Sequence, residues 1–197
     1  HKVFGEANAV LAGDALLTFA PQIIIEQSRG KLSDETILRL VHEYTKFAGA
    51  YALIAGQVVD IETENGKLQK TTEETLDFIH LNKTAAIIVG CMRAGAIIGD
   101  ATEEQLENIT KYATNIGLSF QIADDILDIT GDESKLGKKV GSDIDNNKST
   151  YPSLIGLEKS KEIANDLINE AKTRISNIKG DTEFLNDLAE YIVARDY

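Results

Sequence analysis

The chain has 197 residues and a net charge of −12, with 43% apolar and 26% charged residues. This balance fits one globular domain with a sizeable core and excludes a disordered chain, while the excess of acids argues against nucleic-acid binding and excludes a polybasic membrane anchor. The single cysteine, Cys91, permits neither an internal disulfide nor a Cys-based zinc site, and it suits the reducing cytoplasm in which we expect the protein.

The first half of the chain shows helical periodicity throughout. The spacing predicts a helix over residues 4–27, with a kink or break at Pro21. Ser33 is expected to cap a second helix that runs to about residue 62. Residues 71–74 (Thr-Thr-Glu-Glu) match a capping box, which predicts a third helix that ends near residue 98.

The second half continues the helical pattern after one interruption. Residues 102–105 (Thr-Glu-Glu-Gln) form another capping box, and the helix that follows is expected to end near residue 129. Residues 131–149 carry three glycines and no apolar period, so we predict a long loop there. Pro152 fits the first turn of a helix over 153–178. Gly180 and Asp181 end that helix and cap a last one over 182–195.

No strand alternation is visible, so the predicted fold class is all-α, a single helical domain over residues 1–197 that is large enough for a bundle. We expect no membrane span, because Arg93 interrupts the most apolar stretch, 85–92, after eight residues and a span needs about 20. The first residues lack both a signal-peptide pattern and an initiator Met, so we do not expect His1 to be the natural N-terminus.

The most informative segment is 117–128, GLSFQIADDILD. At about 100° per residue, Gln121, Asp124 and Asp128 form one polar stripe along a helix, with Asp125 beside it. Apolar residues lie on both sides of the stripe and indicate a helix buried by neighbours: Phe120, Ala123 and Leu127 on one face, and Ile122, Ile126 and Ile129 on the other. Buried carboxylates repel one another, and a hard cation such as Mg²⁺ compensates them.

Alternative interpretations of this segment stay open on periodicity alone. The acids could form a solvated face with half-exposed isoleucines beside them. Calcium in an EF-hand is excluded, because its ligands come from a 12-residue loop and not from a helix.

Further polar residues interrupt apolar helices. Gln57 and Asp60 lie one turn apart among valines and isoleucines, and Lys83 with Thr84 precedes an apolar run. A lysine there could contact a phosphate or extend to solvent, and the residues do not decide between these readings. The predicted loop carries basic residues among its acids, which indicates either a charged ligand or a solvated run: Lys135, Lys138, Lys139 and Lys148. The three histidines show no metal-like spacing and receive no chemical role.

Five segments, taken in order, resemble the trans-isoprenyl diphosphate synthase family, of the bacterial farnesyl diphosphate synthase type. They are FGEANAVLAGDALLTFA, GQVVDIE, HLNKTAAII, GLSFQIADDILDITGD and LGKKVGSDIDNNKSTYPSLIG. The DDILD stretch matches the family's second aspartate-rich motif, D-D-x-x-D. The similarity covers essentially the whole chain.

This resemblance implies a helical bundle around a central cavity, usually a homodimer, that condenses isopentenyl diphosphate with an allylic diphosphate. It implies that Asp124, Asp125 and Asp128 bind Mg²⁺, which holds the allylic diphosphate. It also implies roles for the other matched positions. Lys83, Lys138 and Lys148 contact the diphosphate, Thr84 and Gln121 lie near the reacting carbon, and Gln57 and Asp60 line the cavity.

One departure from the family pattern affects the interpretation. The first aspartate-rich motif, and the residues that set product length and contact isopentenyl diphosphate, lie upstream of the segment that opens at His1. We therefore expect a truncated or partly covered synthase that is inactive as residues 1–197 alone, with a fifteen-carbon product preferred. The alternatives are a geranylgeranyl or other chain-length synthase, and a non-catalytic subunit of a hetero-oligomeric synthase. A terpene cyclase of similar fold is disfavoured, because its second metal site usually has an N-S-E pattern.

Overall fold

The structure is a computed structural model that describes residues 1–67, 71–131, 148–176, 178 and 180–195. Within these residues every regular element is a helix, and the only β pairing is an isolated bridge between Arg29 and Leu32. The all-α prediction is therefore confirmed. Most of the loop predicted for 131–149, including Lys135, Lys138 and Lys139, lies outside the described residues.

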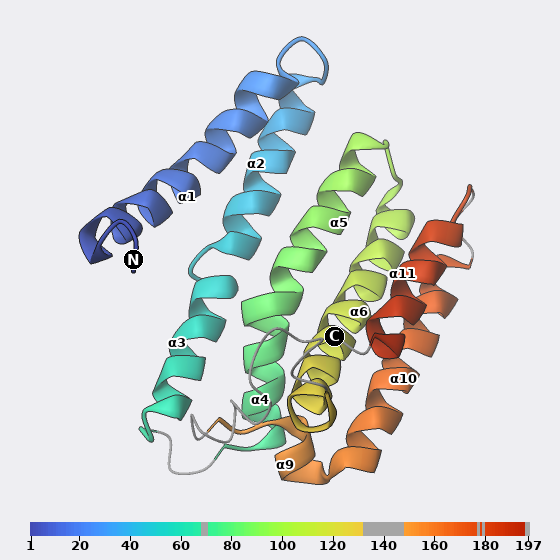
Figure 1. Cartoon of the computed structure of the whole chain (residues 1–197). Coiled ribbons are helices and arrows are strands. Elements are labelled where there is room, and N and C mark those ends of the chain that lie inside the picture. The colour runs from blue at the N-terminus through green and yellow to red at the C-terminus, as the bar shows by residue number, and fades with distance from the viewer. Residues whose placement is uncertain (68–70, 132–147, 177, 179, 196–197) are drawn as a thin grey trace.

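The first two helices form an antiparallel pair along one side of the molecule (Figure 1). Helix α1 (Glu6–Ser28) contains Pro21 without ending there, so the predicted break is absent. Helix α2 (Asp34–Ala48) begins where the sequence predicts, because the Ser33 hydroxyl accepts a hydrogen bond from the Thr36 amide at 3.1 Å.

The prediction of one helix from Ser33 to about residue 62 was wrong. Helix α2 ends at Ala48, and a separate helix α3 (Leu53–Glu64) follows after a short turn. The residue after α2, Gly49, has φ −92° and ψ −165°, an extended conformation that cannot continue a helix. The turn sets the start of α3, the helix on which Gln57 and Asp60 lie.

The third predicted helix has the expected extent but an unexpected middle. It comprises α4 (Glu73–Ile79), a π-helical turn η1 (His80–Ala85) and α5 (Ala86–Ile98). Thr72 caps its start by accepting a hydrogen bond from the Thr75 amide at 3.2 Å. Short π-helical segments within α-helices are rare and occur often at functional sites. The η1 segment contains Lys83 and Thr84.

Helix α6 (Glu103–Thr130) is the central element of the bundle and begins with the predicted Thr102–Gln105 capping box. It packs against η1, α5, α10 and α11, and twelve of its 28 residues are buried. The expectation that apolar residues are covered on both faces holds for Ile122 but is wrong for Ile129, which is 44% exposed. The reason is position, because Ile129 lies in the last turn of α6, beyond the packed part of the helix.

The predicted helix over 153–178 is also two helices. The short α9 (Tyr151–Ile155), which has Pro152 in its first turn, is followed by α10 (Leu157–Ile175). Gly156 separates them with φ 88°, a left-handed conformation that favours glycine. The last helix, α11 (Glu183–Ala194), packs with α10 against α6 around a core cluster: Ile109, Tyr112, Ile116, Ile168, Ala171, Ile175, Ala189 and Ile192.

Two helical stretches among the described residues, Glu6–Ser28 and Glu73–Ile98, are long and apolar enough to cross a membrane by length and composition alone. This differs from the expectation based on 85–92, because the helices continue through isolated charged residues such as Arg93. It is weak evidence for a span, since core helices of globular proteins pass the same test.

Candidate active site

The π-helical turn η1 joins two neighbouring helices through polar side chains. Lys83 Nζ donates a hydrogen bond to the buried carboxylate of Asp60 on α3 at 2.5 Å. One residue later, Thr84 Oγ1 donates to Gln121 Oε1 on α6, also at 2.5 Å. Four residues that the sequence singled out separately are thus paired across three helices.

A small cavity lies where these pairs meet. Its volume is about 20 Å³, space for a single water molecule. Asp60, Lys83, Gln121 and Lys148 supply its polar lining, and Leu76, Ile79 and His80 complete it. The structure therefore brings together residues from α3, η1, α6 and the segment before α9, which are distant in sequence.

A second cavity of about 230 Å³ is lined by two of the three DDILD aspartates. Asp125 and Asp128 line it together with Lys148, so this lysine belongs to both cavities. The remaining lining residues are Ile129, Thr150, Pro152 and Ser153. Two carboxylates and one ammonium give this cavity a net negative charge, so an anionic ligand there would need a cation such as Mg²⁺ beside it.

The three aspartates of DDILD differ in their surroundings. Asp125 and Asp128 are buried, whereas the Asp124 side chain is 34% exposed and its Oδ1 lies 3.7 Å from an Arg195 nitrogen. Asp125 Oδ2 accepts a hydrogen bond from the Tyr151 amide at 3.0 Å and lies 3.3 Å from His80 Nε2. Its other oxygen, Oδ1, is buried without a hydrogen-bond partner among the described residues.

These residues fit a Mg²⁺ site of limited coordination. Among the described residues, no three His, Cys, Asp or Glu side chains lie close enough to hold a metal ion. Mg²⁺ typically takes one or two protein carboxylates and fills its other positions with water and phosphate oxygens. The accessible Asp124 carboxylate, the cavity-lining Asp128 and the unpartnered oxygen of Asp125 are hard oxygen donors of the required type.

Two predicted site residues, Gln57 and Lys138, are not placed at either cavity by the structure. Gln57 is half-buried on α3, one turn before Asp60, and lines neither of the two cavities. Lys138 lies outside the described residues.

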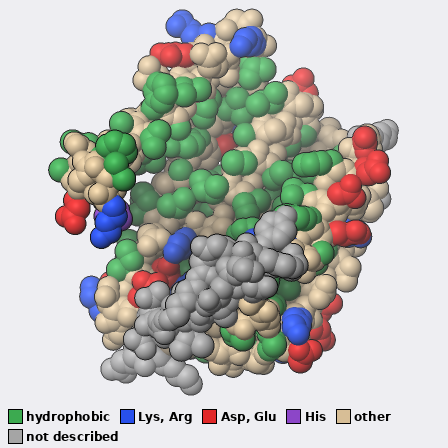
Figure 2. Space-filling view, viewed as in Figure 1, with side chains coloured by type: hydrophobic (Ala, Val, Ile, Leu, Met, Phe, Trp, Pro, Cys, Tyr) green, Lys and Arg blue, Asp and Glu red, His purple; other side chains and the backbone are tan. Residues whose placement is uncertain are grey.

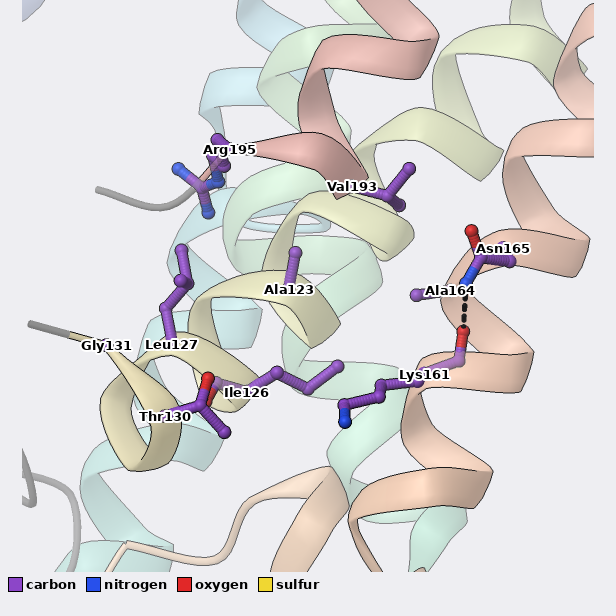
Figure 3. A pocket seen from close by; sticks show the side chains of 10 residues that line it. All are labelled: Ala123, Ile126, Leu127, Thr130, Gly131, Lys161, Ala164, Asn165, Val193 and Arg195. Atoms are coloured by element: carbon purple, nitrogen blue, oxygen red, sulfur yellow. Dashed lines mark hydrogen bonds between the residues drawn. The ribbon is translucent and has the colours of Figure 1, made fainter.

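A further cavity, of about 480 Å³, lies between α6, α10 and α11 (Figure 3). None of the predicted site residues lines it. Its wall is mixed: Ile126 from α6 points toward Lys161 of α10, whereas Leu127 points toward Arg195. Arg195 borders it with its guanidinium carbon 4.1 Å from the centre of the Phe120 ring. Burial lowers the pKa of this guanidinium, which still stays charged.

The sequence did not assign a role to His80, which the structure buries beside Asp125. The ring of His80 also stacks on Tyr151, with centroids 5.7 Å apart and planes 15° apart. The Tyr151 hydroxyl donates a hydrogen bond to Asp77 Oδ1 on α4, and burial, together with this contact, raises the pKa of the phenol well above its usual value. Spacing among the histidines could not reveal this role, because the partners of His80 lie 45 and 71 residues further along the chain.

Comparison with known proteins gives one consistent result. A family profile described as polyprenyl synthetase matches residues 1–185. The farnesyl diphosphate synthase of Bacillus subtilis (strain 168) is 47% identical over 197 residues, which cover 100% of this chain and 66% of that protein. A putative geranylgeranyl pyrophosphate synthase 8, chloroplastic, of Arabidopsis thaliana is 46% identical over 197 residues, with 100% and 55% covered.

Among solved structures, a geranyltransferase from Helicobacter pylori complexed with magnesium and isoprenyl diphosphate superposes with a TM-score of 0.79 at 28% identity. The match covers 98% of this chain and 61% of that structure. The chain thus spans between about half and two thirds of the length of the relatives that it matches.

Proposed function

Because the chain belongs to the polyprenyl synthetase family, we propose that the protein is a prenyltransferase that condenses isopentenyl diphosphate with an allylic diphosphate. Farnesyl diphosphate is the preferred product. Geranylgeranyl diphosphate is the alternative, because relatives named for the two products are about equally similar to this chain. The observation that carries the proposal is the convergence of Asp60, Lys83, Gln121 and Lys148 on one cavity beside the aspartates of α6.

The reaction breaks the allylic C–O bond, so that the diphosphate leaves with the electron pair and a carbocation forms. The double bond of isopentenyl diphosphate then forms the new C–C bond. Loss of a proton from the resulting cation restores a double bond, and the released diphosphate accepts that proton. No histidine is required as the base that removes this proton.

The charged residues act on the leaving group. In this proposal Lys83 and Lys148, with Lys138 from the undescribed segment, neutralise the diphosphate, while Asp124, Asp125 and Asp128 hold Mg²⁺. Bound Mg²⁺ supplies further charge neutralisation on the diphosphate oxygens. The Lys83–Asp60 ion pair fixes the lysine before substrate arrives.

The polar pair on the other side of η1 acts on the carbocation. The oxygen atoms of Thr84 and Gln121 hydrogen-bond to each other and lie on facing helices. Their dipoles can face the developing positive charge, and Asp60 lines the neighbouring cavity, whereas Gln57 lies one turn away on α3. Apolar neighbours such as Leu76 and Ile79 keep water from the cation.

The test is incubation of the protein with radiolabelled isopentenyl diphosphate and dimethylallyl or geranyl diphosphate, with and without Mg²⁺. We expect no product from residues 1–197 alone and Mg²⁺-dependent product from a longer chain that includes the family's upstream aspartate-rich motif. Chromatography distinguishes fifteen from twenty carbons. Lack of product from the longer chain with every allylic substrate would refute the catalytic proposal, and product that appears only after addition of a second polypeptide would support the subunit alternative.

Lys83→Ala provides a residue-level test. We expect the affinity for the allylic diphosphate to fall by about tenfold or more, because a charge-assisted contact to phosphate contributes about 1.5–3 kcal/mol. Lys135→Ala is the control, since Lys135 matches no residue that the family resemblance places at the diphosphate. Equal losses in the two variants would show that general positive charge, and not a built site, binds the substrate.

A further inference from the structure

The π-helical turn η1 is held by unusually close backbone packing on two sides. A Cβ atom at Gly56 of α3 would lie 2.3 Å from the backbone nitrogen of Lys83. A Cβ at Gly117 of α6 would lie 2.6 Å from the Cβ of Ala85. Both distances are shorter than real Cβ contacts, so only glycine permits this approach. These contacts limit how far η1 can move sideways, but they do not fix its rotation about the helix axis.

A polar cluster at the start of η1 supplies that constraint. It consists of Asp77, His80, Asp125 and Tyr151, and we call it the His80 cluster. His80 is 2% exposed, and its Nε2 lies 3.3 Å from Asp125 Oδ2. The Nε2–H tautomer of the ring can donate a hydrogen bond to the carboxylate in this arrangement.

The cluster ties three helices together. Asp125 Oδ2 also accepts the Tyr151 amide at 3.0 Å, which attaches the first residue of α9 to α6. The Tyr151 hydroxyl donates to Asp77 Oδ1, which attaches α9 to α4, one turn before His80. His80 stacks on the Tyr151 ring, so it contacts both Tyr151 and Asp125. The position of η1 relative to α6 is thus defined by one buried carboxylate and two rings.

We propose that His80, with Asp125 and Tyr151, is a positioning residue that holds η1 in the register at which Lys83 meets Asp60 and Thr84 meets Gln121. The inference rests on the proposed prenyl transfer for its kinetic consequence only. The side chain of His80 need not contact the substrate, because it acts through the backbone that carries Lys83 three residues later. Asp125 serves this register through Oδ2, whatever its unpartnered Oδ1 binds.

The test compares His80→Ala and His80→Gln with the wild-type protein. Glutamine keeps an N–H donor for Asp125, whereas alanine removes it. His42→Ala is the matched control, because His42 is an exposed histidine on α2. Hydrogen exchange of the amides of residues 80–85 is measured first, without substrate. We expect about tenfold faster exchange in His80→Ala, a near-normal rate in His80→Gln, and no change in His42→Ala.

Kinetics then separate positioning from general destabilisation. Below the unfolding temperature of each variant, we expect His80→Ala to lose roughly 100-fold in kcat/KM for the allylic diphosphate, the scale of a misplaced catalytic group. His80→Gln should recover most of it. The double variant His80→Ala/Lys83→Ala should be little worse than Lys83→Ala, because both changes act through the same lysine.

Each result has a defined meaning. Unchanged exchange at 80–85 in His80→Ala overturns the inference, and so does an additive double variant or a His80→Gln variant as impaired as alanine. If His80→Ala does not fold, Tyr151→Phe replaces it, since this change removes only the link to Asp77 and should raise exchange at 80–85 by a smaller factor. If the wild-type chain with the upstream aspartate-rich motif makes no prenyl product, the proposed function fails, whereas exchange and calorimetric binding of Mg²⁺ with inorganic diphosphate still test the positioning role.

Discussion

Helices α6 and α1 are the two longest helices among the described residues, and they differ sharply in burial. Helix α6 has helices on several sides and buries twelve residues, including two aspartates. Helix α1 is the more apolar of the two, yet none of its 23 residues is buried, because it packs mainly on α2. The comparison shows that burial here follows from the number of neighbouring helices and not from apolar content.

The exposed side of α1 contributes to an apolar face of the molecule. Figure 2 shows hydrophobic side chains gathered there. Seven large apolar residues of α1 are at least 40% exposed: Val10, Leu11, Leu16, Leu17, Phe19, Ile23 and Ile25. Faces of this kind are typical of interaction sites. The homodimer expected from the family resemblance stays a prediction, since the structure contains one chain.

The largest expected contrast between the two helices is catalytic. We predict that Asp124→Ala on α6 lowers turnover by about 10²–10³-fold without unfolding the protein, because the carboxylate is partly exposed and serves charge stabilisation at the site. Asp14→Ala is the control, an exposed acid on α1. Steady-state assays at saturating Mg²⁺ provide the measurement. Wild-type turnover in Asp124→Ala would refute the assignment of Asp124 to the metal and diphosphate site.

The next contrast concerns a buried ion pair in the part of the bundle that contains α6. Arg93 on α5 donates two hydrogen bonds to the buried Glu43 of α2, at 2.6 and 2.7 Å, and a third to Thr110 of α6 at 2.7 Å. Arg93→Ala should cost about 3–5 kcal/mol of unfolding free energy, because it leaves the Glu43 charge buried and unpaired. Urea denaturation measures this loss. Arg93→Met with Glu43→Leu should recover most of it, and equal loss in the double variant would contradict the explanation.

Two leucines test the comparison with matched chemistry. Leu106 on α6 is 2% exposed, and Leu17 on α1 is 50% exposed. We expect Leu106→Ala to lower the unfolding free energy by about 2–5 kcal/mol and Leu17→Ala by about 0.5 kcal/mol or less. Equal losses in urea denaturation would mean that another surface covers α1 in solution.

The smallest expected effect is a pH dependence. The hydrogen bonds from Arg93 lower the pKa of the Glu43 carboxyl, although burial acts in the opposite direction. A depressed pKa in the folded state adds stability that is present above the unfolded-state pKa and is lost as pH falls through the folded-state value. Between about pH 5 and pH 3, the urea midpoint should therefore fall more steeply in the wild type than in Glu43→Gln. Parallel profiles would show that Glu43 does not contribute.

The sequence was sufficient where a structural feature depends on neighbouring residues. The caps at Ser33 and Thr102 are correct, because a capping hydrogen bond joins atoms only three residues apart. The all-α class is correct because apolar periodicity is a local property. The aspartate helix was also identified locally, since Asp124 and Asp128 lie on consecutive turns of α6.

Only the tertiary structure decided the site pairs and the role of His80. Lys83 and Asp60 are 23 residues apart, Thr84 and Gln121 are 37 apart, and His80 and Asp125 are 45 apart. Such pairs form because helix packing brings distant backbone segments together, and no local pattern encodes that distance. The π-helical turn also depends on tertiary packing, because it approaches α3 and α6 at a distance that only Gly56 and Gly117 permit.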